Sequence, residues 1–347
     1  MDKKQNFMKN LLVTGGMGFI GSNFIRHLIE REQEYNILNV DKLTYAGNPE
    51  NLKDIEKNHS QTHKFYNLDI CNFQAMRKIV KEENVHYIIN FAAESHVDRS
   101  INNPNIFCET NITGTQTLLN IAREQNQIEK FIQISTDEVY GSLNFEDPAF
   151  TEGTPLSPNS PYSASKASAD LLVTAYFKTY DLPINITRCS NNYGPYQFPE
   201  KLIPLMINNA MNDKELPIYG KGINVRDWIY VKDHCEAILK VLQEGEPGEI
   251  YNIGGDSELA NIDLVKKLIK LLNKPESLIK FVKDRPGHDL RYAIDHSKIT
   301  KELGWEPTID LEEGLEKTVK WYQTHETWLK NVITKEYLNY YENQYNC

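Results

Sequence analysis

The size, composition and charge of the chain exclude several classes of protein. It has 347 residues, 40% of them apolar and 25% charged, which suits a globular enzyme of two domains and argues against disorder or a fibre. The formal net charge is −10 and the cations are spread along the chain, so we expect no nucleic-acid partner.

The cysteines and the apolar runs predict a reduced, cytoplasmic protein. The five cysteines are odd in number, far apart and without CxxC spacing, so we expect neither disulfides nor a bound metal. The chain starts without an apolar leader, and no later stretch approaches the about 18 uninterrupted apolar residues of a membrane helix. We therefore expect no membrane span and no membrane partner.

Short β-branched runs alternate along the chain with longer segments of helical period. The runs predict strands at residues 11–15, 35–41, 63–69, 85–92, 130–136 and 184–190. Amphipathic segments lie between most of them; residues 72–84, for example, place Phe73, Met76 and Val80 on one face. The alternation predicts an α/β fold with a Rossmann-type, doubly wound parallel sheet and helices on both faces.

The pattern loosens after residue 190 and predicts a second, smaller α/β domain. The Rossmann domain is expected to comprise residues 1–190 and about 231–256, with the segment 249–255 returning to the sheet. The second domain is expected to comprise about 191–230 and 257–347, and it contains Pro- and Gly-rich stretches.

The first predicted strand runs into a GxxGxxG motif, made by Gly15, Gly18 and Gly21. This spacing permits a tight turn, close approach to a pyrophosphate and close packing of the following helix, although alone it also fits a plain glycine-rich turn. Asp41 ends the next strand, where a carboxylate accepts hydrogen bonds from ribose hydroxyls and repels a 2′-phosphate. We therefore predict NAD rather than NADP, although Lys42 would soften that repulsion.

Two further features refine the nucleotide prediction. Asp69 and Ile70 follow the third strand and are placed to flank the adenine, although a simple strand-end aspartate explains Asp69 nearly as well. No GxxxxGK[ST] motif occurs, so a P-loop ATPase is excluded.

A tyrosine and a lysine are four residues apart in the segment that begins at Pro161. Tyr162 and Lys166 lie on one face of a predicted helix, although a surface lysine above an ordinary tyrosine has the same spacing. Ionising a phenol at neutral pH requires about 4 kcal/mol, and one cation at about 4 Å supplies about as much. Lys166 could therefore lower the phenol pKa, and the positive ring of oxidised NAD would add to this effect. Together with the glycine motif and Thr136, the pair predicts a nicotinamide-dependent alcohol oxidation site.

Several segments together resemble one enzyme family: "TGGMGFIGS", "NVDKLTYAGN", "FAAESHVDRSI", "ISTDEVYG", "SPYSASKA", "RCSNNYGPYQFPEKLIP" and "NVRDWIYVKDH". The chain is similar to the dTDP-glucose 4,6-dehydratases of the extended short-chain dehydrogenase/reductase family from about residue 9 to 330. The segment around Asp137 and Glu138 is the most specific part. Related epimerases and decarboxylases usually lack adjacent Asp and Glu after the threonine.

The resemblance implies conversion of dTDP-glucose to dTDP-4-keto-6-deoxyglucose with tightly bound NAD. Oxidation at carbon 4 acidifies the C5–H; Glu138 is then the base, Asp137 the acid for the departing 6-hydroxyl, and hydride returns to carbon 6. Thr136 is expected to hydrogen-bond the 4-hydroxyl. Neighbouring side chains of a strand point to opposite faces, so both carboxylates reach one sugar only if the chain turns there. When two carboxyl groups lie close together, the charge of one raises the pKa of the other, which helps to keep one of them protonated near pH 7.

The resemblance also assigns binding residues and no metal ligands. The expected NAD-binding residues are Gly15, Gly18, Phe19, Ile20, Gly21, Asp41, Lys42, Asp69, Ile70, Ala92, Ala93, Thr110, Tyr162, Lys166 and Asn191. The expected substrate-binding residues are Ser95, His96, Thr136, Asn191, Glu200, Lys201, Leu202, Tyr219, Arg226, Asn261, Arg285 and His288. Bidentate arginines suit a diphosphate, although each taken singly also suits the surface. His96 also fits a packed structural role.

Other readings of the sequence remain open. A sugar-nucleotide 4-epimerase or decarboxylase would use the same tyrosine and NAD without the carboxylate pair, and a silent NAD-binding regulator would be free to lose Tyr162 or Lys166. The helix expected at about 104–124 and the Tyr162 helix match the homodimer surface of the family, yet both also fit ordinary packing. The resemblance implies dTDP-rhamnose biosynthesis as the pathway, which the residues themselves do not identify.

Overall fold

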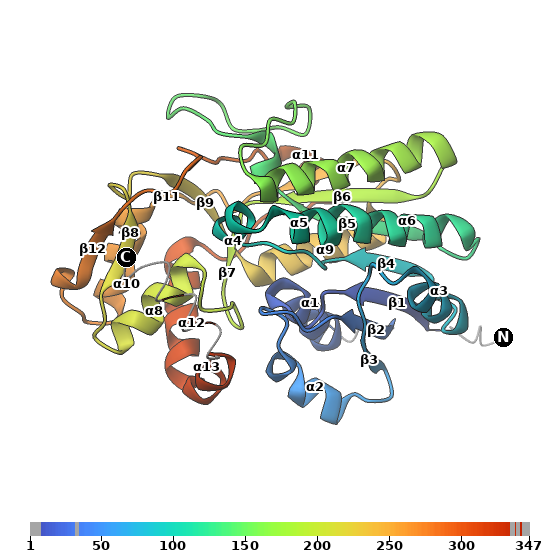
Figure 1. The fold of residues 1–347 in the computed structure, drawn as a ribbon, viewed down its shortest axis with the longest axis horizontal. Helices are drawn as coiled ribbons and strands as arrows, with labels where there is room; N and C mark the ends of the chain where they lie inside the picture. The colour runs from blue at the N-terminus through green and yellow to red at the C-terminus, as the bar shows by residue number, and fades with distance from the viewer. Residues whose placement is uncertain (1–7, 32–34, 334–336, 338–340, 342–347) are drawn as a thin grey trace.

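The computed structural model describes residues 8–31 and 35–333, together with residues 337 and 341. The outer ends of the two predicted domains, and Cys347, therefore lie outside the described residues. Within the described part, the chain forms one large sheet with helices on both sides and a smaller region beside it (Figure 1).

The large sheet has seven strands, and all its pairings are parallel. Their order across the sheet is β10 (Ile250–Ile253), β6 (Ile184–Cys189), β5 (Lys130–Thr136), β4 (Tyr87–Asn90), β1 (Lys9–Thr14), β2 (Tyr35–Asp41) and β3 (His63–Asn67). All six predicted strands are present, with ends that differ by two residues or fewer. The segment 249–255 supplies the edge strand β10. The predicted fold class is therefore confirmed.

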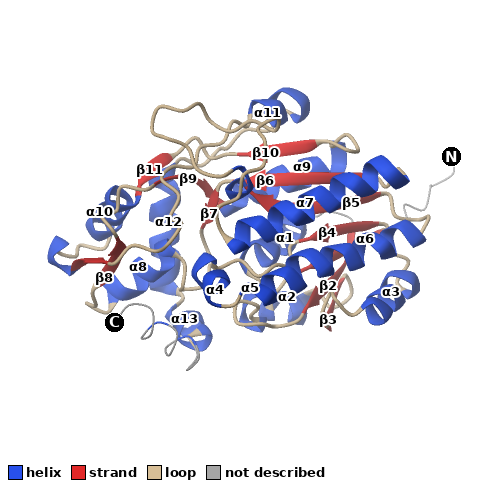
Figure 2. Cartoon of the chain, turned by 45° about the horizontal axis from the view of Figure 1, so that its top comes forward, coloured by secondary structure: helices blue, strands red, loops and turns tan. Residues whose placement is uncertain are grey.

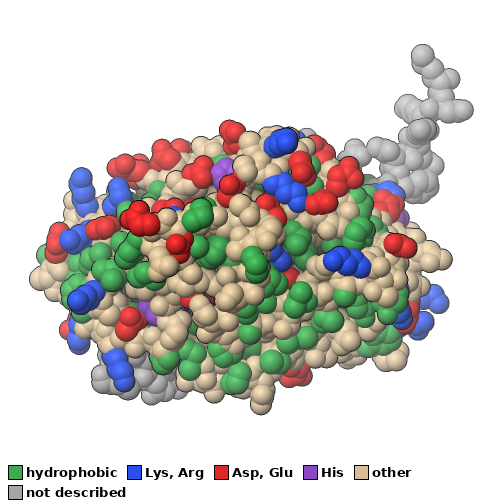
Figure 3. Space-filling model, turned by 90° about the horizontal axis from the view of Figure 1, so that it is seen from above, with side chains coloured by type: hydrophobic (Ala, Val, Ile, Leu, Met, Phe, Trp, Pro, Cys, Tyr) green, Lys and Arg blue, Asp and Glu red, His purple; other side chains and the backbone are tan. Residues whose placement is uncertain are grey.

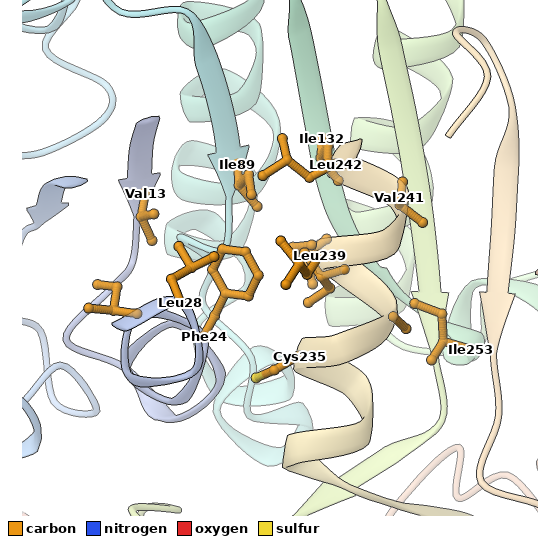
Figure 4. Close-up of a cluster of buried hydrophobic side chains, with 14 of the residues drawn as sticks. Val13, Phe24, Leu28, Ile89, Ile132, Cys235, Leu239, Val241, Leu242 and Ile253 are labelled. Atoms are coloured by element: carbon orange, nitrogen blue, oxygen red, sulfur yellow. The ribbon is translucent and has the colours of Figure 1, made fainter. Parts of the chain in front are cut away.

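One face of the sheet is covered by α1 (Phe19–Glu30), α9 (Val231–Glu244) and α11 (Ser297–Leu303). Val13, Ile89 and Ile132 project from the strands toward Phe24 and Leu239 of these helices (Figure 4). Because side chains alternate along a strand, apolar runs such as that of β1 supply both faces of the sheet at once.

The opposite face is covered by a second group of helices (Figure 2). These are α3 (Phe73–Glu82), α4 (Val97–Asn102), α5 (Pro104–Phe107), α6 (Thr115–Glu124) and α7 (Pro161–Tyr180). Leu12 and Phe131 pack here against Val80 and Leu118. The helix expected at about 104–124 is confirmed, with a π-helical segment, Cys108–Gly114, between α5 and α6.

The C-terminal region has two smaller sheets. The first contains β7 (Asn191–Tyr193), β9 (Val225–Tyr230) and β11 (Glu258–Ala260), and the second pairs β8 (Leu216–Tyr219) with β12 (Ile279–Val282). The helices here are α8 (Leu202–Met211), α10 (Asn261–Leu271), α12 (Leu311–Thr324) and α13 (Glu326–Val332). They share a separate apolar core that includes Tyr193, Ile207, Leu268 and Tyr322.

The remaining short elements lie in connections. They are α2 (Lys53–Asn58) and the 3₁₀ turns Pro49–Asn51, Asp137–Tyr140 and Glu276–Leu278. Acidic, basic and apolar side chains are mixed over the face seen from above in Figure 3. Within the described ranges, no helix combines the length and the apolar character needed to cross a bilayer.

The strand order places a ligand crevice at one edge of the sheet. β1 lies between β2 and β4, so the connections from this point run in opposite directions along the sheet. In such doubly wound sheets, ligands bind outside the carboxyl ends of the strands at the point of reversal. The loops after β1, β2, β4 and β5 meet there, and they carry most of the predicted site residues.

Candidate active site

A cavity of about 290 Å³ opens at the carboxyl ends of the strands. All fifteen residues predicted to bind NAD line it, namely Gly15, Gly18, Phe19, Ile20, Gly21, Asp41, Lys42, Asp69, Ile70, Ala92, Ala93, Thr110, Tyr162, Lys166 and Asn191. Of the other predicted residues, Ser95, Thr136, Glu138, Glu200 and Lys201 also line the cavity. Segments far apart in the sequence therefore meet in one place.

The remaining predicted residues lie outside the lining of this cavity. Asp137 begins the 3₁₀ turn after β5, His96 precedes α4, and Arg226 lies in β9. Leu202 begins α8, Tyr219 ends β8, Asn261 begins α10, and Arg285 and His288 follow β12. Two charges of this group, Arg285 and Arg226, nevertheless oppose the effect of burial on the Glu138 pKa, so both lie near that carboxylate.

The glycine-rich turn has a backbone that only glycine suits. Gly15 has φ +71°, and a Cβ added there would lie 2.6 Å from the backbone nitrogen of Ala92. A Cβ at Gly21 would collide with the Gly15 carbonyl. No side chain caps α1, which starts after Gly18, so its first N–H groups are available to an anion at the cavity wall. The turn therefore fits a pyrophosphate.

Asp41 is held rigidly at the end of β2. Its Oδ2 accepts the Met17 N–H over 3.0 Å, and its Oδ1 accepts the Leu43 N–H over 2.8 Å. Burial raises the pKa of this carboxyl, and both hydrogen bonds oppose the rise. Lys42 pairs with Asp69 over 2.6 Å, so its charge is directed toward the end of β3.

The first turn of α7 presents the tyrosine, and the turn after it the lysine. Ser160 caps the helix: its Oγ accepts the Ser163 N–H, and the Ser163 hydroxyl accepts the Ser160 N–H in return. Pro161 is at the first helical position, which its fixed φ favours. Lys166 Nζ donates to the Ile134 carbonyl of β5 over 2.6 Å, so the helix is joined to the strand that leads into the acidic turn.

The expected lowering of the tyrosine pKa is wrong for the described structure. Burial raises the pKa of Tyr162 well above its usual value, and the charges of Glu138, Cys189 and Asp137 add to this effect. Burial also lowers the pKa of Lys166. The physical reason is that Lys166 gives a hydrogen bond to a carbonyl, whereas the acidic turn acts directly on the phenol.

The predicted turn after β5 is confirmed. The strand ends at Thr136, and Asp137–Tyr140 forms a 3₁₀ turn that is followed by Gly141 with φ +97°. Thr136 Oγ1 accepts the Glu138 N–H over 3.3 Å and donates to Asp137 Oδ1 over 3.2 Å. The turn brings both carboxylates to one end of the strand, whereas an extended chain would separate them.

The two carboxyl groups have different surroundings. Asp137 is 1% exposed, and its Oδ2 has no hydrogen-bond partner among the described residues. Burial raises its pKa well above the usual value, and the Glu138 charge adds to the rise. Burial raises the Glu138 pKa too, but three cations oppose that rise, namely Arg285, Lys201 and Arg226. Asp137 is thus the group more readily protonated.

The three cations that act on Glu138 are held by specific partners. Lys201 Nζ donates to the Ser95 carbonyl over 2.9 Å, and Arg226 Nη2 donates to the Asp289 carbonyl over 3.0 Å. The Arg285 guanidinium lies 3.3 Å from Asp98 Oδ1. These contacts anchor three positive side chains near Glu138.

The two predicted histidines both have a lowered pKa. Burial lowers the pKa of His96 well below its usual value, and Lys201 acts in the same direction. Burial also lowers the pKa of His288, to about 4, and its Nδ1 lies 2.7 Å from Asp284 Oδ1. Both rings are therefore neutral near pH 7.

A family comparison gives this geometry its context. The family model described as GDP-mannose 4,6 dehydratase matches residues 12–318. The chain belongs to this family.

Individual members of the family are similar over almost the whole chain. A dTDP-glucose 4,6-dehydratase from Neisseria meningitidis serogroup B is 50% identical over an alignment of 349 positions, which covers 95% of this chain and 98% of that protein. The crystal structure of a dTDP-glucose 4,6-dehydratase from Bacillus anthracis in complex with NAD is 50% identical, with a TM-score of 0.87 and coverage of 94% and 100%. The structure of DesIV, a dTDP-glucose 4,6-dehydratase from Streptomyces venezuelae with NAD bound, is 46% identical, with a TM-score of 0.90 and coverage of 93% and 100%. The resemblance found in the sequence is confirmed.

This family member has site residues that the sequence alone did not reveal. Asp98 uses both carboxylate oxygens: Oδ1 faces Arg285 and Oδ2 accepts the Tyr219 hydroxyl over 3.0 Å. Arg99, next to it, lies 3.8 Å from the ring of Tyr45 and pairs with Glu200. The available signal was their place in "AAESHVDRS", two and three residues after His96.

Proposed function

We propose that the chain catalyses the NAD-dependent dehydration of dTDP-glucose to dTDP-4-keto-6-deoxyglucose. The single observation that carries this function is the turn at Asp137 and Glu138. Glu138 of this turn lines the same cavity as Tyr162 and Lys166. A dehydratase requires a hydride-transfer site and an acid/base pair at one sugar. Membership of the family and 50% identity to dTDP-glucose 4,6-dehydratases support the assignment.

The cavity fits NAD as the resident cofactor. Gly15, Gly18 and Gly21 form the turn for the pyrophosphate, and Asp41 is oriented by two backbone N–H groups toward a ribose. When bound, NAD supplies the hydride acceptor for carbon 4, the hydride donor for carbon 6 and a positive charge. The remaining chemistry falls to side chains of this chain.

Tyr162 takes the proton of the 4-hydroxyl, with Thr136 as a hydrogen-bond partner of the same oxygen. Because burial and the acidic turn raise the phenol pKa, the tyrosine is protonated until positive charge enters the cavity. Lys166 is the chain's own cation next to it on α7, and its anchoring to the Ile134 carbonyl keeps the ammonium fixed during proton transfer.

Glu138 removes the C5 proton and returns it to carbon 5 when hydride adds to carbon 6, and Asp137 protonates the departing 6-hydroxyl. Cations oppose the effect of burial on Glu138, which favours the anionic base. Asp137 is buried with one oxygen unpartnered, which favours the protonated acid. Two carboxyl groups with different surroundings are the usual way to hold an acid and a base at one pH.

The substrate diphosphate is assigned to the cationic side of Glu138, where Arg226, Arg285 and Lys201 lie. Guanidinium groups suit phosphate oxygens in a bidentate geometry. The remaining predicted contacts are Ser95, His96, Asn191, Glu200, Leu202, Tyr219, Asn261 and His288. Thymine differs from uracil by one methyl group, worth about 1 kcal/mol in an apolar pocket, so dTDP is assigned from the relatives.

Organisation and location follow the same assignment. We place NAD in a domain of residues 1–190 and about 231–256, and the sugar nucleotide in a domain of about 191–230 and 257–347. A homodimer is supported by Leu171 and Tyr180 of α7, which are 62% and 46% exposed although apolar or aromatic. A cytoplasmic location suits a nucleotide-sugar substrate.

The assay for this function uses dTDP-glucose and the purified protein. We expect a 4-keto-6-deoxy product without net formation of NADH, because hydride returns to the sugar. A 4-epimer or a decarboxylated sugar as the main product would contradict the dehydratase assignment.

A further inference from the structure

A continuous chain of buried hydrogen bonds joins the C-terminal helix α13 to the glycine-rich turn. Trp328 Nε1 donates to Asn51 Oδ1 over 2.9 Å, and Asn51 Nδ2 donates to the Met17 carbonyl over 2.8 Å. The Met17 N–H donates in turn to Asp41 Oδ2 over 3.0 Å. Three hydrogen bonds thus connect α13 with the carboxylate assigned to the cofactor ribose.

The chemistry of the partners fixes the direction of this chain. An indole N–H only donates and a backbone carbonyl only accepts, so a single orientation of the Asn51 amide satisfies both neighbours. Trp328 is 7% exposed, Asn51 1% and Met17 0%, so water does not replace a lost partner easily. The Asn51 amide is therefore held in one orientation between α13 and the glycine-rich turn.

Other contacts converge on the same point. The Met17 carbonyl also accepts the Asn48 N–H over 2.9 Å, so both of its lone pairs are used. Arg26 of α1 donates to the Asn51 carbonyl through Nε and Nη2, over 3.1 and 2.6 Å. Its guanidinium lies 4.5 Å from the centre of the Tyr196 ring. The glycine-rich turn, α1 and the C-terminal region thus meet at Asn51.

We propose that Trp328 and Asn51 are positioning residues that hold the glycine-rich turn in the conformation that retains NAD. The inference rests on the proposed function, in which NAD is regenerated at every turnover and does not need to dissociate. Met17 lies between Gly15 and Gly18, and it orients Asp41 through its own N–H. A turn that is already held in place loses less freedom when the nucleotide binds, and this tightens binding.

The test measures how fast bound NAD exchanges with isotopically labelled NAD in the purified holoenzyme. Trp328→Phe keeps an aromatic ring but removes the indole N–H together with the five-membered ring that carries it. We expect about tenfold faster exchange, as for the loss of one buried hydrogen bond. Trp321→Phe is the matched control, because this ring packs 5.0 Å from that of Trp328 but takes no part in the three hydrogen bonds. Equal exchange in both variants would overturn the inference.

A second variant tests the chain from its middle. Asn51→Asp keeps an acceptor for Trp328 but replaces the donor to the Met17 carbonyl with an oxygen, so exchange should be faster still. The rate of backbone hydrogen exchange over residues 15–21 should rise in Trp328→Phe and in Asn51→Asp. The KM for dTDP-glucose at saturating NAD should stay unchanged in these two variants. Wild-type rates in both variants would refute the positioning role. A wild-type protein that binds no NAD would instead contradict the proposed function.

Discussion

The two sides of the cavity are built in different ways. On the side of the large sheet, the polar residues come directly after strand ends: Gly15 follows β1, Asp41 ends β2, and Thr136 ends β5. On the C-terminal side, the cations come from separate elements and bind partners that are distant in the sequence, as Arg285 binds Asp98. The first side is set by local backbone geometry and the second by long-range pairs.

This difference predicts the size of mutational effects. The side chains of the acidic turn and Tyr162 of α7 are assigned to the reacting atoms and have no substitute, whereas each of the three cations shares its task with the others. Replacements in the acidic turn and on α7 should therefore reduce turnover far more than replacements among the pairs that hold the cations.

Glu138→Gln should give the largest effect. Loss of the base should slow turnover by about 10³-fold, within the range for general acid–base catalysis, while oxidation at carbon 4 persists. Asp137→Asn should behave similarly. Steady-state assays and single-turnover absorbance of the reduced cofactor check both steps. Glu146→Gln, in the exposed loop that follows, is the control; unchanged turnover in both site variants would remove the turn from the elimination.

Tyr162→Phe should act earlier in the reaction and about 10²-fold, because it removes the group that takes the alcohol proton. The measurement is the rate of cofactor reduction in a single turnover. Tyr87→Phe, which removes a hydroxyl that donates to Glu129 at the amino end of β4, should react like the wild type. Normal cofactor reduction in the Tyr162 variant would exclude the phenol from the oxidation.

The sequence predicted the strand-end side well. The glycine motif, Asp41 and the Tyr162/Lys166 pair are local signals, and all of them line the cavity. The expected effect of Lys166 on the phenol pKa failed because spacing along a helix does not reveal which acceptor the ammonium chooses, here the Ile134 carbonyl. It also does not reveal how strongly the turn at Asp137 opposes ionisation.

Residues that act through long-range pairs were harder to find. Asp98 is an ordinary helix residue in the sequence, and its role depends on Tyr219 and Arg285, which are 121 and 187 residues away. Trp328 and Asn51 are likewise 277 residues apart. No periodicity or motif in the sequence predicts these pairs, because they depend on how the C-terminal region packs against the large sheet and its loops.

Asp98→Asn should give a moderate effect of a different kind. It keeps an acceptor for Tyr219 but removes the charge that holds Arg285, so KM for dTDP-glucose should rise by about tenfold with little change in kcat. Asp213→Asn, which removes a surface ion pair with Lys274, is the control. A fall in kcat without a change in KM would contradict a role in positioning the substrate side.

Asp137→Asn should slightly stabilise the protein, although it slows turnover. Its folded pKa is raised, so the folded state binds the proton more tightly than the unfolded state, and stability falls as pH rises above about 4. Asn cannot ionise, so Asp137→Asn should raise Tm by about 2 °C at pH 7, with a smaller gain at pH 4. Thermal melts at the two pH values check this sign. A variant less stable at pH 7 would contradict it.

The fate of a label on sugar carbon 4 tests the central claim most directly, that one cavity joins hydride transfer to elimination by Asp137 and Glu138. With dTDP-glucose deuterated at carbon 4, NMR of the product should show the deuterium at carbon 6 of a 4-keto sugar. Deuterium that returns to carbon 4, or a product that keeps its 6-hydroxyl, would contradict the account.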